Sequence, residues 1–181
     1  MHSAIDALLD ALGHAPGGRI APAAVERIEV RGYKMVAFLG EKRPKNLFGT
    51  RFSVPFSLAT IIAHGRADLD VFSAAAYADR EIMALASRVE VTEVADFTAE
   101  FHARQIVEVE IRCKDGRVLH GRCDITKGEP GNPHAATDIK RKFDQLAAPV
   151  WGANNAGRVY AACMTVDALA DVGEFCAGLE L

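Results

Sequence analysis

The strongest pattern of hydrophobic and polar positions lies in residues 106–125. Apolar and polar residues alternate from Val107 to Cys113 and again from Leu119 to Ile125. This period of two predicts two antiparallel strands, each with one apolar and one polar face. A shorter alternation over Arg27–Gly32 predicts another strand, and residues 88–94 are expected to form one more.

The turn of this hairpin admits two registers. A two-residue turn at Asp115-Gly116 would place His120 on the apolar face of the sheet. A three-residue loop that ends with Gly116 in the left-handed conformation keeps apolar residues opposite apolar ones, so we favour it. In this register the expected pairs are Ile111 with Leu119, Val107 with Cys123, Glu108 with Arg122, and Glu110 with His120.

Apolar residues spaced by three and four positions predict helices elsewhere. The first covers residues 3–12, where Ser3 and Asp6 resemble a capping box. Residues 34–39 are expected to be extended. A helix is expected over Phe52–His64, with Pro55 in its first turn, and one or two more within residues 73–87. Another is expected over Ala135–Ala147, with Ile139, Phe143 and Leu146 facing inward and Pro149 ending it. The last covers residues 153–179, with breaks near Thr165 and Gly173.

Strands and helices mix without strict strand–helix–strand alternation, and at least one hairpin is antiparallel. We therefore predict an α+β fold with a small mixed or antiparallel sheet flanked by helices. The length of 181 residues favours a single domain over residues 1–181.

Composition excludes several classes of protein. The net charge of −3 lacks the basic excess of a nucleic-acid binder, and no apolar run approaches the length of a membrane span. The sequence shows no signal-peptide pattern, so a cytoplasmic protein is expected. The cysteines form no CxxC pair and the histidines no HxxxH pair, which disfavours a metal site. Dinucleotide, P-loop and α/β-hydrolase motifs are also missing.

Two features are candidates for chemistry. Residues 41–51 place Lys42, Arg43, Lys45 and Arg51 just before a predicted helix start, where an anion would be favoured. The alternative is an ordinary solvated loop. His2 is a candidate acid or base, because an unperturbed imidazole titrates near neutrality. The alternative is a frayed terminal histidine.

Several short strings together resemble one family. In chain order they are His2–Ala7 (HSAIDA), Val25–Val30 (VERIEV), Arg51–Phe56 (RFSVPF), Gly128–Pro133 (GEPGNP) and Lys142-Phe143. Their order and spacing resemble the MmgE/PrpD family, which includes 2-methylcitrate dehydratase, cis-aconitate decarboxylase and iminodisuccinate epimerase. The resemblance covers nearly the whole chain but only the second half of a usual family member.

The resemblance implies an α+β lid domain, which in the family follows a larger helical domain and closes over an active site between the two. The family acts without a cofactor on small polycarboxylates. Here His2 matches the histidine of the lid, while a lysine that precedes it in the family would lie before Met1. Phe56 stands where many members carry a tyrosine. Arg51 is the best candidate for a carboxylate contact, and the other substrate-binding candidates are Lys45, Thr50, Ser53 and Phe56.

The resemblance thus predicts the lid domain or small subunit of a lyase or isomerase, inactive alone and paired with a separate helical subunit. The expected substrate is a small di- or tricarboxylate. The alternative is a non-catalytic lid-fold module or degenerate fragment that binds a partner or itself. An uncovered lid would expose an apolar patch, so we expect a homo-oligomer in isolation.

Overall fold

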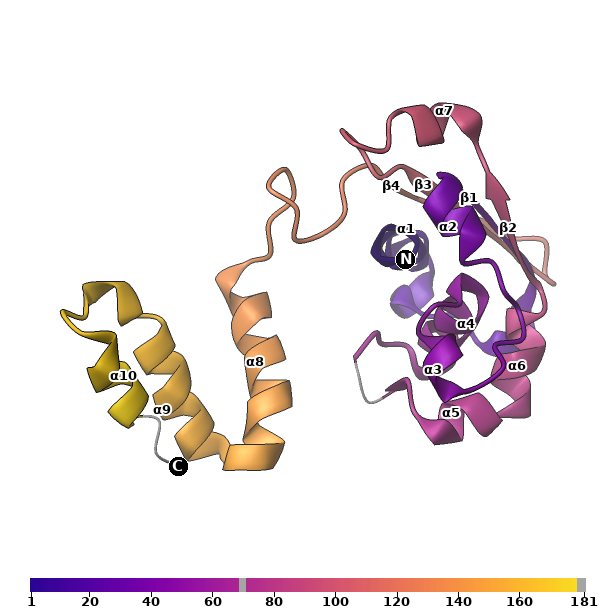
Figure 1. The fold of residues 1–181 in the computed structure, drawn as a ribbon. Coiled ribbons are helices and arrows are strands. Elements are labelled where there is room, and N and C mark those ends of the chain that lie inside the picture. Colours follow the sequence, from indigo (N-terminus) through magenta and orange to yellow (C-terminus); the bar gives the residue numbers. More distant parts are fainter. Residues whose placement is uncertain (69–70, 179–181) are drawn as a thin grey trace. The chain divides into compact units, whose positions relative to one another are not determined.

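The structure is a computed structural model that describes residues 1–68 and 71–178. These residues form two compact units, unit 1 from Met1 to Asn132 and unit 2 from Pro133 onward. Figure 1 shows the helices and strands of both units. The single domain over residues 1–181 stays a prediction.

Unit 1 is built on a four-stranded mixed sheet in the order β2-β1-β3-β4. Strand β1 pairs parallel with β2 and antiparallel with β3, and β3 pairs antiparallel with β4. The predicted α+β fold is therefore confirmed. The strands are β1 (Val25–Gly32), β2 (Val89–Glu93), β3 (Val107–Cys113) and β4 (Val118–Cys123).

The hairpin of β3 and β4 has the predicted three-residue register. Ile111 lies opposite Leu119, and Glu110 lies opposite His120. Gly116 has a φ of +87°, the left-handed conformation that this loop requires. The register places the charged residues of both strands on one face of the sheet.

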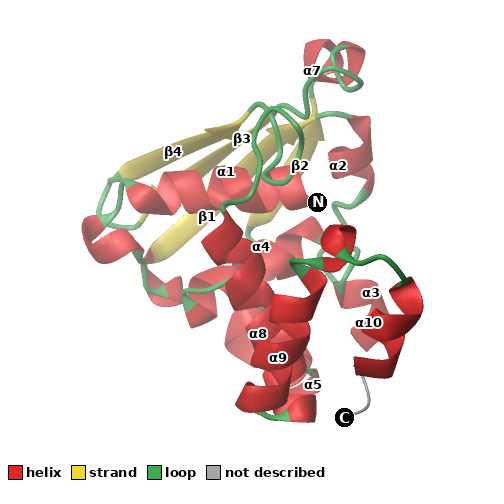
Figure 2. Cartoon of the chain, turned by 90° about the vertical axis from the view of Figure 1, so that its left-hand side faces the viewer, coloured by secondary structure: helices red, strands yellow, loops and turns green. Residues whose placement is uncertain are grey.

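Helices α1 and α4 of unit 1 cover the apolar face. Figure 2 shows α1 lying along the sheet, and the contact is close because β4 contributes Gly121. A Cβ at this position would lie 2.1 Å from the Ala7 carbonyl oxygen of α1. The helices of unit 1 are α1 (His2–Gly13), α2 (Lys34–Phe38), α3 (Leu47–Thr50), α4 (Val54–His64), α5 (Ala74–Ala78), α6 (Arg80–Ala86) and α7 (Ala95–Ala99), with 3-10 turns at Pro16–Gly18 and Pro22–Ala24.

The opposite face of the sheet is a network of ion pairs. Glu108 of β3 lies between Arg31 of β1 at 2.9 Å and Arg122 of β4 at 2.5 Å. Arg122 also binds Asp124, at 2.9 Å. The hydrogen bond from Arg122 lowers the pKa of the Asp124 carboxyl. We call this side of the sheet the charged face. Arg31 and Arg122 on it are paired with carboxylates of β3 and of Asp124, the residue directly after β4.

Unit 2 is a helical hairpin followed by a short helix. Helix α8 (Ala136–Trp151) packs against α9 (Ala153–Cys163), and Phe143 contacts the ring of Tyr160 with centroids 5.3 Å apart. A 3-10 turn over Val166–Ala168 precedes α10 (Val172–Gly178).

Two local predictions in unit 1 were wrong. Ser3 does not cap α1, because Met1 is the N-cap residue and Ser3 is buried inside the first turn. Residues 34–39 are not extended. They form the one-turn helix α2, which buries Val36 over the end of the sheet.

Two predictions in unit 2 were also wrong. Helix α8 continues past Pro149 and ends at Trp151, before Gly152, whose φ of +76° is not helical. Ile139 and Leu146 do not face inward within this unit, since they are 53% and 49% exposed. The predicted breaks near Thr165 and Gly173 are both present, because α9 ends at Cys163 and residues 169–171 separate the 3-10 turn from α10, of which Gly173 is the second residue.

Candidate functional site

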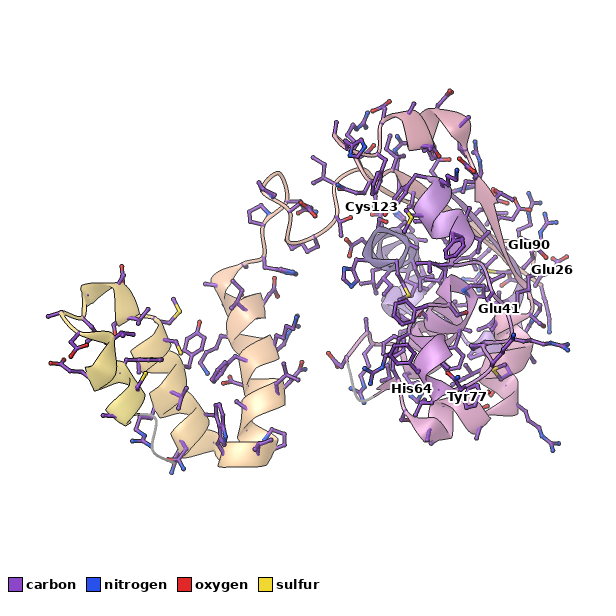
Figure 3. The ribbon with its side chains drawn as sticks, viewed as in Figure 1. Glu26, Glu41, His64, Tyr77, Glu90 and Cys123 are labelled. Carbon is purple, nitrogen blue, oxygen red and sulfur yellow. The ribbon has the colours of Figure 1, made fainter. Side chains whose placement is uncertain are left out.

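A closed loop of residues 39–54 joins α2 to α4 and carries most of the candidate site residues. The Val54 amide donates to the Leu39 carbonyl oxygen at 2.8 Å. Ser53 Oγ donates to the carbonyl oxygen of Glu41 at 2.5 Å, and Glu41 is labelled in Figure 3. Because these bonds join the two ends, the 39–54 loop is closed at its base and presents its middle to solvent.

Further hydrogen bonds fix the interior of the loop. Asn46 Oδ1 accepts a backbone amide within α3 at 2.8 Å, and Thr50 Oγ1 donates to the Leu47 carbonyl oxygen at 2.6 Å. The hydroxyl of Tyr77, also labelled in Figure 3, donates to the Pro44 carbonyl oxygen at 3.1 Å. The loop is thus tied to α5 as well as to itself.

Three of the predicted substrate-binding residues are buried in this arrangement. Ser53 Oγ accepts the Phe56 amide at 3.0 Å and so caps α4. Phe56 is fully buried, and its ring meets the Tyr77 ring edge-on at 6.5 Å. Thr50 is buried too. In unit 1, therefore, Thr50, Ser53 and Phe56 shape the loop from the inside.

The cations of the loop divide into two kinds. Lys42 Nζ binds the Glu90 carboxylate of β2. Arg43, Lys45 and Arg51 are exposed, and within residues 1–68 and 71–178 their side chains form no ion pair or hydrogen bond. The sequence grouped all four as one anion-binding candidate, and the structure leaves three of them available to a ligand.

The first turn of α1 lies beside the first turns of α4. Met1 Sδ accepts a hydrogen bond from Ser57 Oγ at 3.0 Å. Ser3 Oγ and the Tyr33 hydroxyl form a buried hydrogen bond of 3.2 Å, which holds the other side of this turn. His2 is exposed on the turn. The structure thereby brings the histidine to the same end of α4 that carries the 39–54 loop.

The glycine- and proline-rich segment after β4 also reaches α1. The Lys127 amide donates to Asp6 Oδ2 at 2.8 Å, and Asn132 Nδ2 donates to the Ile125 carbonyl oxygen at 2.9 Å. An open cavity of about 540 Å³ lies between this segment and α1. On its wall, burial, helped by the Asp6 carboxylate, raises the pKa of the Cys123 thiol to about 11. This thiol is therefore protonated at neutral pH and a poor nucleophile.

The arrangement offers an imidazole for proton transfer and cationic side chains for binding carboxylates. The described residues contain no group of three or more His, Cys, Asp or Glu side chains that could hold a metal ion. No helix in the part of the chain that the structure describes is long and apolar enough to cross a bilayer.

Two residues that position the site were missed by the sequence analysis. Tyr33 holds the first turn of α1, and its ring stacks on Phe101 with centroids 4.5 Å apart. Tyr77 holds the 39–54 loop at Pro44. Both act through contacts more than 25 positions away along the chain, which no local pattern reveals.

The family model of the MmgE/PrpD C-terminal domain matches residues 1–165. The chain therefore belongs to the MmgE/PrpD family and represents its C-terminal domain. No curated protein matches the chain significantly. The match covers all of unit 1 and extends to residue 165 in unit 2.

Proposed function

We propose that the chain is the lid domain or small subunit of a cofactor-independent lyase or isomerase that acts on a small polycarboxylate. The observation that carries this proposal is the Met1–Ser57 contact, which brings the first turn of α1 to the N-terminal end of α4, where the 39–54 loop ends. His2 and the exposed cations of the loop can then face one ligand. The family match over residues 1–165 supports the same assignment.

In this proposal His2 exchanges a proton with the carbon next to a substrate carboxylate. Arg51 binds a carboxylate with its guanidinium fork, and Lys45 adds a second positive charge. Thr50, Ser53 and Phe56 keep the loop in the conformation that presents these cations. Proton abstraction also needs a group that stabilises the resulting carbanion. We expect the separate helical subunit to provide it, so the chain alone is expected to be inactive.

The experiment begins with affinity capture by the tagged chain in an extract of its native cells. Recovery of a helical MmgE/PrpD-type subunit is expected. The complex is then assayed on methylcitrate, cis-aconitate and related acids. His2→Ala and Arg51→Ala should each lower turnover at least about 100-fold, while the matched control Lys114→Ala, in the hairpin turn, should leave it unchanged.

Turnover that survives both substitutions would contradict the assigned roles. Recovery of the chain alone would favour the second candidate, a non-catalytic lid-fold module that binds itself. The observation that favours this alternative is the burial of Phe56, which leaves the side chain at this position away from solvent in unit 1.

A further inference from the structure

Most of the large apolar side chains exposed in unit 1 lie on α2 and the 39–54 loop. Phe38, Phe48 and Phe52 are 81%, 69% and 52% exposed. Together they expose about two whole phenylalanine side chains, or about 400 Å² of apolar surface. An area of about 400 Å² is within the range of about 300–600 Å² for the largest apolar patch of a typical monomer, and such patches are often functional.

The three phenylalanines belong to one region of the surface. Leu39 follows Phe38 directly, and its carbonyl oxygen accepts the backbone hydrogen bond from Val54 that closes the loop. This bond brings Phe38 near the end of the loop that carries Phe52. The rings of Phe48 and Phe52 are in contact, with centroids 5.2 Å apart. Helix α2 turns the buried Val36 toward the core and leaves Phe38 outside.

Two exposed cationic residues are close to these phenylalanines along the chain. Lys34 is one helical turn before Phe38, and Arg43 is within the loop. In the described parts of the chain neither side chain has an ion-pair or hydrogen-bond partner, whereas Lys42 beside them binds Glu90. Positive charges without a counter-charge in the fold favour a partner that supplies carboxylates, because the charges of two docking surfaces are complementary.

We propose that this region is a docking surface for a second protein that presents apolar side chains flanked by carboxylates. The docking surface consists of Lys34, Met35, Phe38, Arg43, Phe48 and Phe52. The phenylalanines enter apolar pockets of the partner as anchors, and Lys34 and Arg43 pair with carboxylates around them. Lys45 and Arg51 are not part of this surface, because the proposed function assigns them to the substrate. The inference rests on the proposed function only in that the second protein is the helical subunit.

A protein partner fits the charges better than a lipid surface. The whole chain carries a net charge of −3, which opposes adsorption to an anionic bilayer. Docking to a protein requires only that the charges around the apolar patch match opposite charges on the partner. The apolar area is about half of the roughly 800 Å² that each partner buries in a standard complex, so the rim must contribute the rest.

The test is a selection that needs neither substrate nor the natural partner. A display library of single helices, randomised on one face, is selected on the full chain. Helices that bind the wild type should be enriched in apolar residues flanked by Asp and Glu. Binding of the selected helices should weaken at least tenfold on Phe48→Ser/Phe52→Ser and on Lys34→Glu/Arg43→Glu. The matched controls Val118→Ser and Lys114→Glu, both in the β3–β4 hairpin, should stay within twofold of the wild type.

Selected helices without an acidic excess over the input library would overturn the proposal, as would an empty selection or equal losses in the control variants. Stronger association of the wild type with phosphatidylserine vesicles than with the selected helices would also overturn it. Thermal melting verifies that each variant is folded. Because no turnover is measured, failure of docking and failure of the proposed catalysis are separate results.

Discussion

The charged face of the sheet and the 39–54 loop both display arginines and lysines, but they hold them in opposite ways. On the sheet, Glu108 lies between Arg31 and Arg122. On the loop, Arg43 and Arg51 extend into solvent without a carboxylate from the described residues. A paired cation has its counter-charge within the fold, whereas an unpaired one is available to a ligand. We therefore propose that the sheet face contributes stability and that the loop contributes binding.

The largest expected effect lies on the other side of the same sheet. Gly121→Ala would force a methyl group against the backbone of α1, because the added Cβ would lie 2.1 Å from the Ala7 carbonyl oxygen. We expect a loss of about 3 kcal/mol in the free energy of unfolding, measured by urea denaturation. Gly157→Ala, at a helical position with nothing within 4 Å of the added Cβ, is the matched control. Equal stability of the two variants would contradict the close packing of α1 on β4.

Arg51→Ala should separate function from stability. Loss of a charge-assisted carboxylate contact is expected to lower kcat/KM of the complex about 100-fold. The same change should leave the free energy of unfolding within about 0.5 kcal/mol of the wild type, since exposed and unpaired side chains contribute little. A variant that loses stability and activity together would place Arg51 with the residues that maintain the fold.

Arg122→Ala should give the reverse result. It removes the common partner of Glu108 and Asp124 on the charged face and uncovers the Phe97 ring, 5.7 Å from the guanidinium carbon. Because the side chain is partly exposed, we expect a loss of only about 1 kcal/mol in the free energy of unfolding, with unchanged turnover. Chemical denaturation and the assay of the complex measure the two quantities. A fall in turnover at unchanged stability would reverse the comparison.

The smallest expected effect is a pH dependence of the free energy of unfolding in the acidic range. The hydrogen bond from Arg122 lowers the pKa of Asp124 in the folded state. Its stabilisation is therefore complete above the ordinary carboxyl pKa of about 4 and is lost as the pH falls through the lowered value. Thermal melts from pH 6 to 2 should show a shallower decline for Asp124→Asn than for the wild type below about pH 4. Parallel curves would exclude this contribution.

The sequence predicted most of the elements that have a repeating pattern. The hairpin register followed from the side-chain period of two, because a shift by one residue would have buried His120. Helix α4 followed from its apolar spacing and from Pro55 in its first turn. Residues 34–39 were predicted wrongly because a single helical turn is too short to show a period. Whether Val36 is buried by a strand or by a helix depends on the sheet beneath it.

The candidate site could be predicted only in part. The cations of residues 41–51 were recognised by composition, but composition cannot show that Lys42 binds Glu90 across the fold while Arg43 has no such partner among the described residues. The sequence also could not reveal that Ser53 closes the loop at Glu41. Both features depend on residues at least ten positions away.

The most direct test of the different roles of these two regions is hydrogen–deuterium exchange of the chain with and without the proposed helical partner and a tricarboxylate. We expect new protection in residues 41–53 and in the first turn of α1, with little change in β3 and β4. Protection confined to the charged face of β3 and β4, with the loop exchanging as before, would contradict these roles.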